Sequence, residues 1–295
     1  MKATLSNTGS VQIVTKTVDN TFHEEFCSIF NVSEKYIEMC QDAWQDYTKM
    51  KPLEQFNELK RRIRETFPTT FTWSDLINGY CIFIVAHACG DISFWKVSVP
   101  TPEELPNITF MNVFNTKFNT NIMDITAMRL VSVGSKALLF AGNSKGQVNC
   151  VKLTIDKEQV VVNGDLPVWS EADEILIKDI KFLTYQHRSY ILVIKGSDLI
   201  ILLYEEATET FDSYVFHAGN IAIMALETIE DNKLLITCLS GATKELIIGC
   251  ENSKIDVKWR HLYFIVILGL FGSLKVPSST RKAIACKGGT FRERL

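Results

Sequence analysis

Apolar segments alternate with glycine-containing turns along most of the chain. The recurring unit is an apolar strand, a turn with a glycine, and a second apolar strand. From Gly90 onward the turn glycines are separated by 56, 50, 45 and 48 residues, which is close to the roughly 40–50 residues of one β-propeller blade. Glycine suits these turns because it adopts positive φ without steric cost. The six turns are centred on Gly9, Gly90, Gly146, Gly196, Gly241 and Gly289.

Two further β-rich stretches lie between consecutive hairpins. With the two strands of each hairpin they make four strands per unit, which is the composition of a propeller blade. The Phe94-Trp95-Lys96 end of one strand resembles the Trp-Asp signature of WD repeats, with the acid replaced. The added stretches are residues 109–114 and 124–131, 159–162 and 175–182, and 211–216 and 221–226.

One interval breaks this period, because Gly9 and Gly90 are 81 residues apart. The excess has helical periodicity and predicts two helices within about residues 33–67. Ser33 is expected to cap the first helix, and Pro52 is tolerated in the first turn of the second. Leu53, Phe56, Leu59 and Ile63 continue the second helix at helical spacing. We expect a helical insertion between blades, packed on the side of the propeller. The apolar face of the first helix carries Tyr36, Ile37, Cys40, Trp44 and Tyr47.

The predicted fold class is therefore all-β, a partial WD40-like β-propeller over residues 1–295 with a two-helix insertion. It has a three-strand start up to about Val32, four full four-stranded blades, and a three-strand partial blade at the end. Residues 275–295 are an atypical C-terminal segment. The longest apolar run, Leu262–Phe271, is shorter than the roughly 20 residues of a membrane-spanning helix and is expected to form strands.

Composition narrows the class of protein only a little. Apolar residues make up 46% of the 295 positions, which is typical of a folded chain. The net charge of −3 does not favour direct binding of nucleic acid. None of the eight cysteines has the C-x-x-C spacing of zinc or thioredoxin motifs, so we expect buried free thiols. The N-terminus lacks the apolar core of a signal peptide.

The sequence predicts no catalytic, cofactor-binding or metal-ligating residues. The five histidines show no metal-ligand spacing, and no glycine-rich loop precedes a Lys-Ser or Lys-Thr pair. The loop through which many acetyltransferases hold acetyl-CoA pyrophosphate is absent as well. His87, in a strand before a glycine turn, is interpreted as a satisfied core or channel histidine rather than a catalytic base.

One charged segment is the best candidate for an interaction. Lys60, Arg61, Arg62 and Arg64 place four positive charges in about one and a half helical turns of an otherwise acidic chain. A solvated helix face and a contact to phosphate or to an acidic partner are both open interpretations. The acidic stretches 171–174 and 205–206 are interpreted as solvated loops, with a partner-facing patch as the alternative.

The order of these features resembles a known family. The quoted segments follow one another at the expected positions: Phe56-x₅-Arg62, Phe71-Thr-Trp73-Ser74, Gly90–Trp95, Val168–Glu171, Tyr185-Gln186 and Lys195–Ser197. From Ala3 to about Ile248 the chain is similar to the N-terminal WD-propeller region of the WD-repeat (delta) subunit of transcription factor IIIC.

The resemblance implies a nuclear, non-catalytic scaffold subunit in RNA polymerase III transcription of transfer-RNA and other small-RNA genes. Its implied partners are the other transcription factor IIIC subunits and the polymerase III initiation machinery, with DNA contacted only indirectly. The alternatives are a histone acetyltransferase, an activity attributed to the family for which no motif is present here, and a generic WD adaptor outside transcription.

Overall fold

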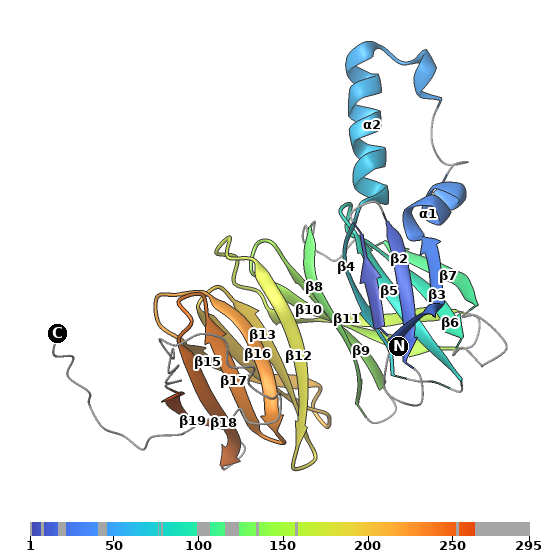
Figure 1. The fold of residues 1–295 in the computed structure, drawn as a ribbon. Helices are drawn as coiled ribbons and strands as arrows, with labels where there is room; N and C mark the ends of the chain where they lie inside the picture. Colours follow the sequence, from blue (N-terminus) through green and yellow to red (C-terminus); the bar gives the residue numbers. More distant parts are fainter. Residues whose placement is uncertain are drawn as a thin grey trace, which may run out of the picture. The chain divides into compact units, whose positions relative to one another are not determined.

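The apolar segments beside the glycine turns are antiparallel β-strands in the computed structural model (Figure 1). The structure describes residues 2–6, 9–16, 22–40, 46–75, 77, 79–98, 107–115, 124–133, 136–156, 159–251 and 254–262. Within these residues the strands form one three-stranded and four four-stranded sheets. This confirms the all-β, propeller-type fold class with its three-strand start and four full blades. The predicted final partial blade and residues 275–295 lie outside the described residues.

The chain divides into two compact units, Met1–Phe182 and Leu183–Leu295. The prediction that residues 1–295 form one partial propeller stays a prediction. The first unit holds three sheets, and in each the neighbours in sequence pair with one another. Their strands are β1 (Lys2–Leu5), β2 (Ser10–Lys16) and β3 (Phe22–Asn31); β4 (Pro68–Trp73), β5 (Tyr80–His87), β6 (Asp91–Ser98) and β7 (Ile108–Asn115); and β8 (Ile125–Val133), β9 (Lys136–Asn143), β10 (Val148–Ile155) and β11 (Val160–Trp169).

The remaining strands form two more four-stranded sheets in sequence order. Strand β12 begins in the first unit and ends in the second, and the strands after it belong to the second unit. They are β12 (Ile177–Tyr185), β13 (Arg188–Lys195), β14 (Asp198–Glu205) and β15 (Thr210–His217), then β16 (Ile223–Glu230), β17 (Lys233–Cys238), β18 (Thr243–Glu251) and β19 (Lys254–Leu262).

The turn glycines have the backbone conformation that their role requires. In each four-stranded sheet the glycine turn joins the second strand to the third. The Gly9 turn joins β1 to β2, so the three strands of the first sheet correspond to the second, third and fourth strands of the others. The φ angles are positive throughout: 82° at Gly9, 95° at Gly90, 88° at Gly146, 58° at Gly196 and 81° at Gly241.

Strand β5 shows why the longest apolar strands lack a polar face. Successive side chains of a strand point to opposite sides of its sheet. Phe83 and Val85 lie in a cluster with residues of β2, while Ile82 and Ile84 lie in a second cluster with residues of β8 and β9. The sheet β4–β7 is thus buried on both faces, which explains its continuous apolar sequence.

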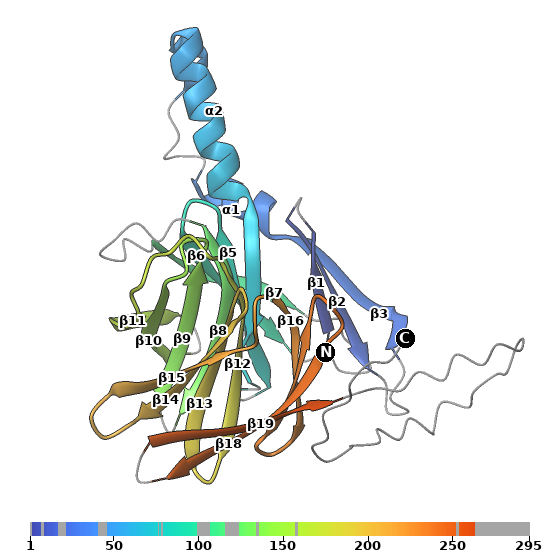
Figure 2. The same cartoon turned by 90° about the vertical axis from the view of Figure 1, so that its left-hand side faces the viewer.

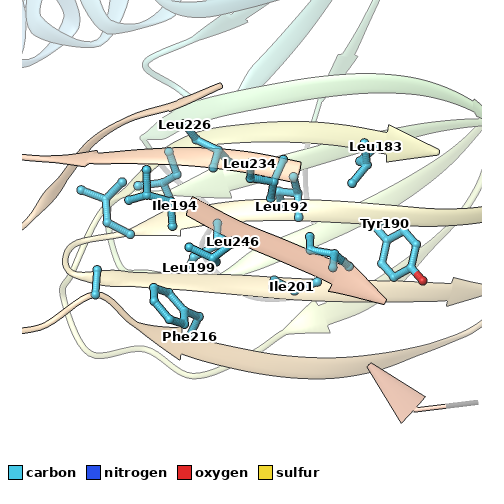
Figure 3. Close-up of a cluster of buried hydrophobic side chains, with 14 of the residues drawn as sticks. Leu183, Tyr190, Leu192, Ile194, Leu199, Ile201, Phe216, Leu226, Leu234 and Leu246 are labelled. Atoms are coloured by element: carbon cyan, nitrogen blue, oxygen red, sulfur yellow. The ribbon is translucent and has the colours of Figure 1, made fainter. Parts of the chain in front are cut away.

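The core of the second unit lies between its two sheets (Figure 3). Side chains of β13 and β14 meet those of β16, β17 and β18 in one buried cluster, with Tyr190 and Ile201 fully buried in it. The aliphatic members alternate along each strand, so one face of each sheet supplies them. They include Leu192, Ile194, Leu199, Leu226, Leu234, Ile236 and Leu246.

Between β3 and β4 the chain forms α1 (Val32–Cys40), the short 3₁₀ helix η2 (Tyr47–Lys49) and α2 (Pro52–Thr66). This confirms the two-helix insertion and the place of Pro52 in the first turn of α2. The predicted cap of α1 is wrong, because the side chain of Asn31 accepts the hydrogen bond from Glu34 N at 3.0 Å. Within the described part of the chain, no helix has the length and apolar character needed to cross a membrane.

The thiols that the structure describes are free, and most lie in the strands. They are Cys81, Cys89, Cys150, Cys238 and Cys250. Burial raises the pKa of Cys150 to about 12 and also raises that of Cys81. These two thiols therefore remain protonated and unreactive at neutral pH.

Candidate protein-interaction surface

The helical insertion is tied to the first unit at its base. The Ser33 hydroxyl, at the start of α1, donates a hydrogen bond to the Thr66 carbonyl at the end of α2 (2.6 Å). Just beyond α2, the Phe67 carbonyl accepts a hydrogen bond from Ala88 N (2.8 Å) in the β5–β6 turn. The two helices are thereby fixed to each other and to the blade that follows.

A buried polar contact reinforces this base. The Tyr36 ring of α1 stacks on the His87 ring of β5, with ring centroids 4.5 Å apart and an interplanar angle of 26°. The Tyr36 hydroxyl donates to Asp91 Oδ2 at 2.5 Å, where β6 begins. All three side chains are buried. Helix α1 thus reaches both strands of the hairpin around Gly90.

His87 continues this contact into the core of the sheet. Its Nε2 lies 2.9 Å from Ser93 Oγ, which also accepts a hydrogen bond from Trp95 Nε1 at 2.9 Å. Burial lowers the pKa of His87 to about 4; the backbone of Thr66 favours the charged form without overcoming burial. Among the residues that the structure describes, Nδ1 has no hydrogen-bond partner. A fully buried, neutral imidazole between the Tyr36 ring and the Ser93 hydroxyl is a core residue, as the sequence predicted. The prediction that its hydrogen bonds are all satisfied is wrong for Nδ1.

The sequence-predicted interaction residues Lys60, Arg61, Arg62 and Arg64 all lie in α2. Two of them are engaged within the helix, because Glu58 accepts hydrogen bonds from Arg61 Nη2 at 2.7 Å and from Arg62 Nε at 2.8 Å. These two hydrogen bonds lower the pKa of Glu58 to about 2. The carboxylate therefore stays charged and neutralises part of the basic segment.

The other two basic residues differ from each other. Arg64 Nη2 lies 3.7 Å from Asp124 Oδ1, just before β8. Lys60 is exposed and has no charged or hydrogen-bonding partner among the residues that the structure describes. The basic segment is thus mostly paired, and Lys60 is its uncompensated charge.

The apolar side chains of α2 face solvent. The exposed fractions are 71% for Leu53, 62% for Phe56, 42% for Leu59 and 63% for Ile63. With 3.6 residues per turn, these four positions fall within an arc of about 120°. We call them the outer stripe. Phe67, immediately after the helix, is also exposed, at 42%.

A different, polar face of α2 is the one partly covered. Gln55, Glu58, Arg62 and Thr66 are half-buried, and the nearby elements of the insertion are α1 and η2. Helix α2 extends away from the ends of β4 and β5 (Figures 1 and 2). The expectation that the insertion packs on the side of the propeller is therefore wrong for α2, whose apolar side chains remain exposed. Its glutamate–arginine pairs let the polar face turn inward instead.

Other candidate chemistry is sparse in the described part of the chain. No group of three or more His, Cys, Asp or Glu side chains there could hold a metal ion. The acidic residues 171, 173 and 174 are exposed in a loop, and Glu205 and Glu206 are exposed at the end of β14 and in the turn that follows it. The outer stripe is the feature that sequence reasoning missed, because helical spacing does not indicate which face is covered.

A repeat of four-stranded blades with a helical insertion between two of them defines a β-propeller domain. The family profile of the β-propeller domain of transcription factor IIIC subunit delta matches residues 3–262. The chain belongs to this family, and the resemblance stated from sequence is confirmed. No individually curated protein is significantly similar to the chain.

Proposed function

We propose that this chain is a non-catalytic scaffold subunit of the transcription factor IIIC complex, acting in the nucleus. In this proposal it supports RNA polymerase III transcription of transfer-RNA and other small-RNA genes. The observation that carries the proposal is the family match over residues 3–262, which spans every described strand from β2 to β19 and most of β1. A propeller presents several loop faces and a rim, which suits assembly of a multisubunit complex.

The state of the reactive side chains supports a scaffold rather than an enzyme. His87 is held neutral in the core, and the thiol of Cys150 is protonated at neutral pH. The histone acetyltransferase activity attributed to the family has no cofactor loop in this sequence. A scaffold accounts for the described residues without requiring such a site.

The expected partners are the other transcription factor IIIC subunits and the polymerase III initiation machinery. We propose that Lys60, Arg61, Arg62 and Arg64 contribute to that contact, and that DNA is reached only through other subunits. The acidic net charge of −3 supports this view, since proteins that grip DNA directly are usually basic. The pairing of Arg61 and Arg62 with Glu58 also leaves them less available to phosphate.

The test is affinity purification of the tagged full chain from nuclear extract. We expect the other transcription factor IIIC subunits to co-purify. Their absence under conditions that recover the folded chain would overturn the proposal and favour a WD adaptor outside transcription.

A second measurement tests the enzyme alternative. Acetyl-CoA is titrated calorimetrically into the purified chain, and acetyl transfer to histone H3 is assayed. We expect no heat of binding and no transfer. Saturable binding together with transfer would replace the scaffold proposal with an acetyltransferase.

A further inference from the structure

We infer that the outer stripe of α2 is a docking site for an acidic amphipathic helix of another protein. The inference rests on the proposed function only in placing that helix within a subunit of the same complex. The proposed function assigns only a contact to the basic residues of α2. The inference adds the contact surface, its apolar anchors and the chemistry of the partner.

The first argument is the orientation of α2. A helix on a globular protein normally turns its apolar face to the core and its charged face to water. Here Gln55, Glu58 and Arg62 are half-buried, while Leu53, Phe56 and Ile63 are more than 60% exposed. A contiguous apolar surface with a polar border is typical of a protein-interaction site.

The second argument is the shape of the surface. The outer stripe runs from Leu53 to Ile63, which is about 15 Å along the helix axis at 1.5 Å per residue. The spacings of three and four residues give a narrow row of side chains. Such a row fits the apolar face of one partner helix, which supplies its own anchors at i, i+3, i+4 and i+7. The backbone groups of α2 are used within the helix, so a partner strand would find no edge to pair with.

The third argument is charge. By the helical repeat, Lys60 lies within the arc of the outer stripe, between Phe56 and Leu53. Arg64 lies just beyond Leu53, on the side away from the half-buried polar face. Segment 52–66 contains four basic and three acidic residues, so its sign is opposite to that of the whole chain. A carboxylate beside the anchors of the partner helix would complement Lys60, the uncompensated charge of this segment.

The same observations disfavour nucleic acid as the occupant. Binding to phosphates relies on cations that can exchange their counterions. In α2, Arg61 and Arg62 are held by Glu58, and Arg64 lies beside Asp124. Leu53, Phe56 and Ile63 offer phosphates no favourable contact. An acidic amphipathic helix uses both the apolar row and the charge of Lys60.

The test begins with a photo-crosslinkable phenylalanine analogue at position 56 of the tagged full chain. The chain is irradiated in nuclear extract with and without nuclease, and the crosslinked peptide is sequenced by mass spectrometry. We expect a nuclease-resistant crosslink to a peptide of another transcription factor IIIC subunit with apolar residues at helical spacing and adjacent Asp or Glu. A crosslink to nucleic acid, to a second copy of this chain or to a non-acidic segment, or no crosslink, overturns the inference.

Two pairs of variants quantify the contact. Leu53→Ser with Phe56→Ser is expected to lower the yield of that crosslinked partner, captured from position 63, by about tenfold or more. Ile229→Ser with Leu239→Ser, which alters exposed apolar residues of the second unit, should leave the yield unchanged. Lys60→Glu should lower the yield severalfold, whereas Lys254→Glu, at another exposed lysine, should not. Equal yields for test and control variants would overturn the inference.

This design separates the two proposals. If the wild-type chain recovers no transcription factor IIIC subunit, the proposed function fails. If it recovers the complex, but position 56 gives no crosslink to an acidic helical segment of another subunit or the α2 variants match their controls, only the docking inference fails.

Discussion

The ring of Tyr36 lies against the ring of His87, 4.5 Å between centroids, and joins the first helix of the insertion to the blade that follows it. The two residues are 51 positions apart in sequence. The Tyr36 hydroxyl extends the contact to Asp91, and His87 extends it to Ser93. Buried contacts therefore hold the base of the insertion to the sheet, while α2 beyond it presents an apolar face to solvent.

Removing the Tyr36 hydroxyl should destabilise this base. Tyr36→Phe keeps the stacked ring but takes away the donor to the buried Asp91 carboxylate, a loss of about 1–3 kcal/mol in the free energy of unfolding. Tyr214→Phe, at an exposed ring, should change it by less than about 0.5 kcal/mol. Urea unfolding followed by fluorescence checks both values. Equal stability of the two variants would show that the hydrogen bond does not hold the insertion.

His87 should make stability depend on pH. Its pKa is about 4 in the folded chain and about 6.5 when unfolded, so the unfolded state binds more protons between these values. The contribution of the neutral histidine is fully present above about pH 6.5 and is lost progressively as the pH falls towards 4. The total loss is about 3 kcal/mol.

His87→Gln provides the comparison, because glutamine stays neutral throughout. Urea midpoints of both chains are measured from pH 7.5 to 4.5, and their difference cancels the carboxylates common to both. The wild-type curve should fall more steeply than that of the variant below pH 6.5. Parallel curves would contradict a depressed pKa for His87.

Truncating two phenylalanines to alanine should change the free energy of unfolding by very different amounts. Phe83 is fully buried between aromatic rings, so Phe83→Ala should cost about 3–5 kcal/mol through lost contacts and a cavity. Phe56 is 62% exposed in α2, so Phe56→Ala should change stability by less than about 0.5 kcal/mol. Chemical unfolding of the isolated chain measures both. A large cost for Phe56→Ala would mean that its side chain is covered by this chain itself.

Gly142 should not tolerate a side chain. A Cβ at this position would lie 2.4 Å from Ile177 Cγ2 and 2.6 Å from Ile177 Cβ, where β9 approaches β12. Gly142→Ala should therefore destabilise the chain by about 1–3 kcal/mol. At Gly249, a strand glycine of β18, the nearest atom to an added Cβ is 3.9 Å away, so Gly249→Ala should be close to neutral. Similar melting temperatures for both variants would contradict the close approach of β9 and β12.

The strands and their turns were predictable because the signals are local. A glycine between two apolar runs predicts a hairpin, because the turn needs a residue with positive φ and glycine adopts it, as at Gly90 and Gly146. The interval of 81 residues likewise indicated an insertion, and Pro52 marked the first turn of its second helix. Each of these features depends on residues that are neighbours in the chain.

What could not be predicted depends on contacts across the chain. Ser33 and Asn31 are both good capping residues, and Ser33 is drawn away by the Thr66 carbonyl 33 positions later. The spacing of Leu53, Phe56 and Ile63 is the same for a core face and for an exposed one. Which face of α2 is covered depends on α1, η2 and the pairing of Glu58 with its arginines, none of which the periodicity encodes.

The most direct test of the account is hydrogen–deuterium exchange of the α2 amides, residues 53–66, in the free chain and in purified transcription factor IIIC containing it. Docking of a partner helix on the outer stripe should slow exchange of α2 by about tenfold or more in the complex. The amides around Phe83, already buried in the free chain, should be unchanged and serve as the reference. Equal exchange of α2 in the two samples would contradict the central claim that the outer stripe of this helix binds another subunit of the complex.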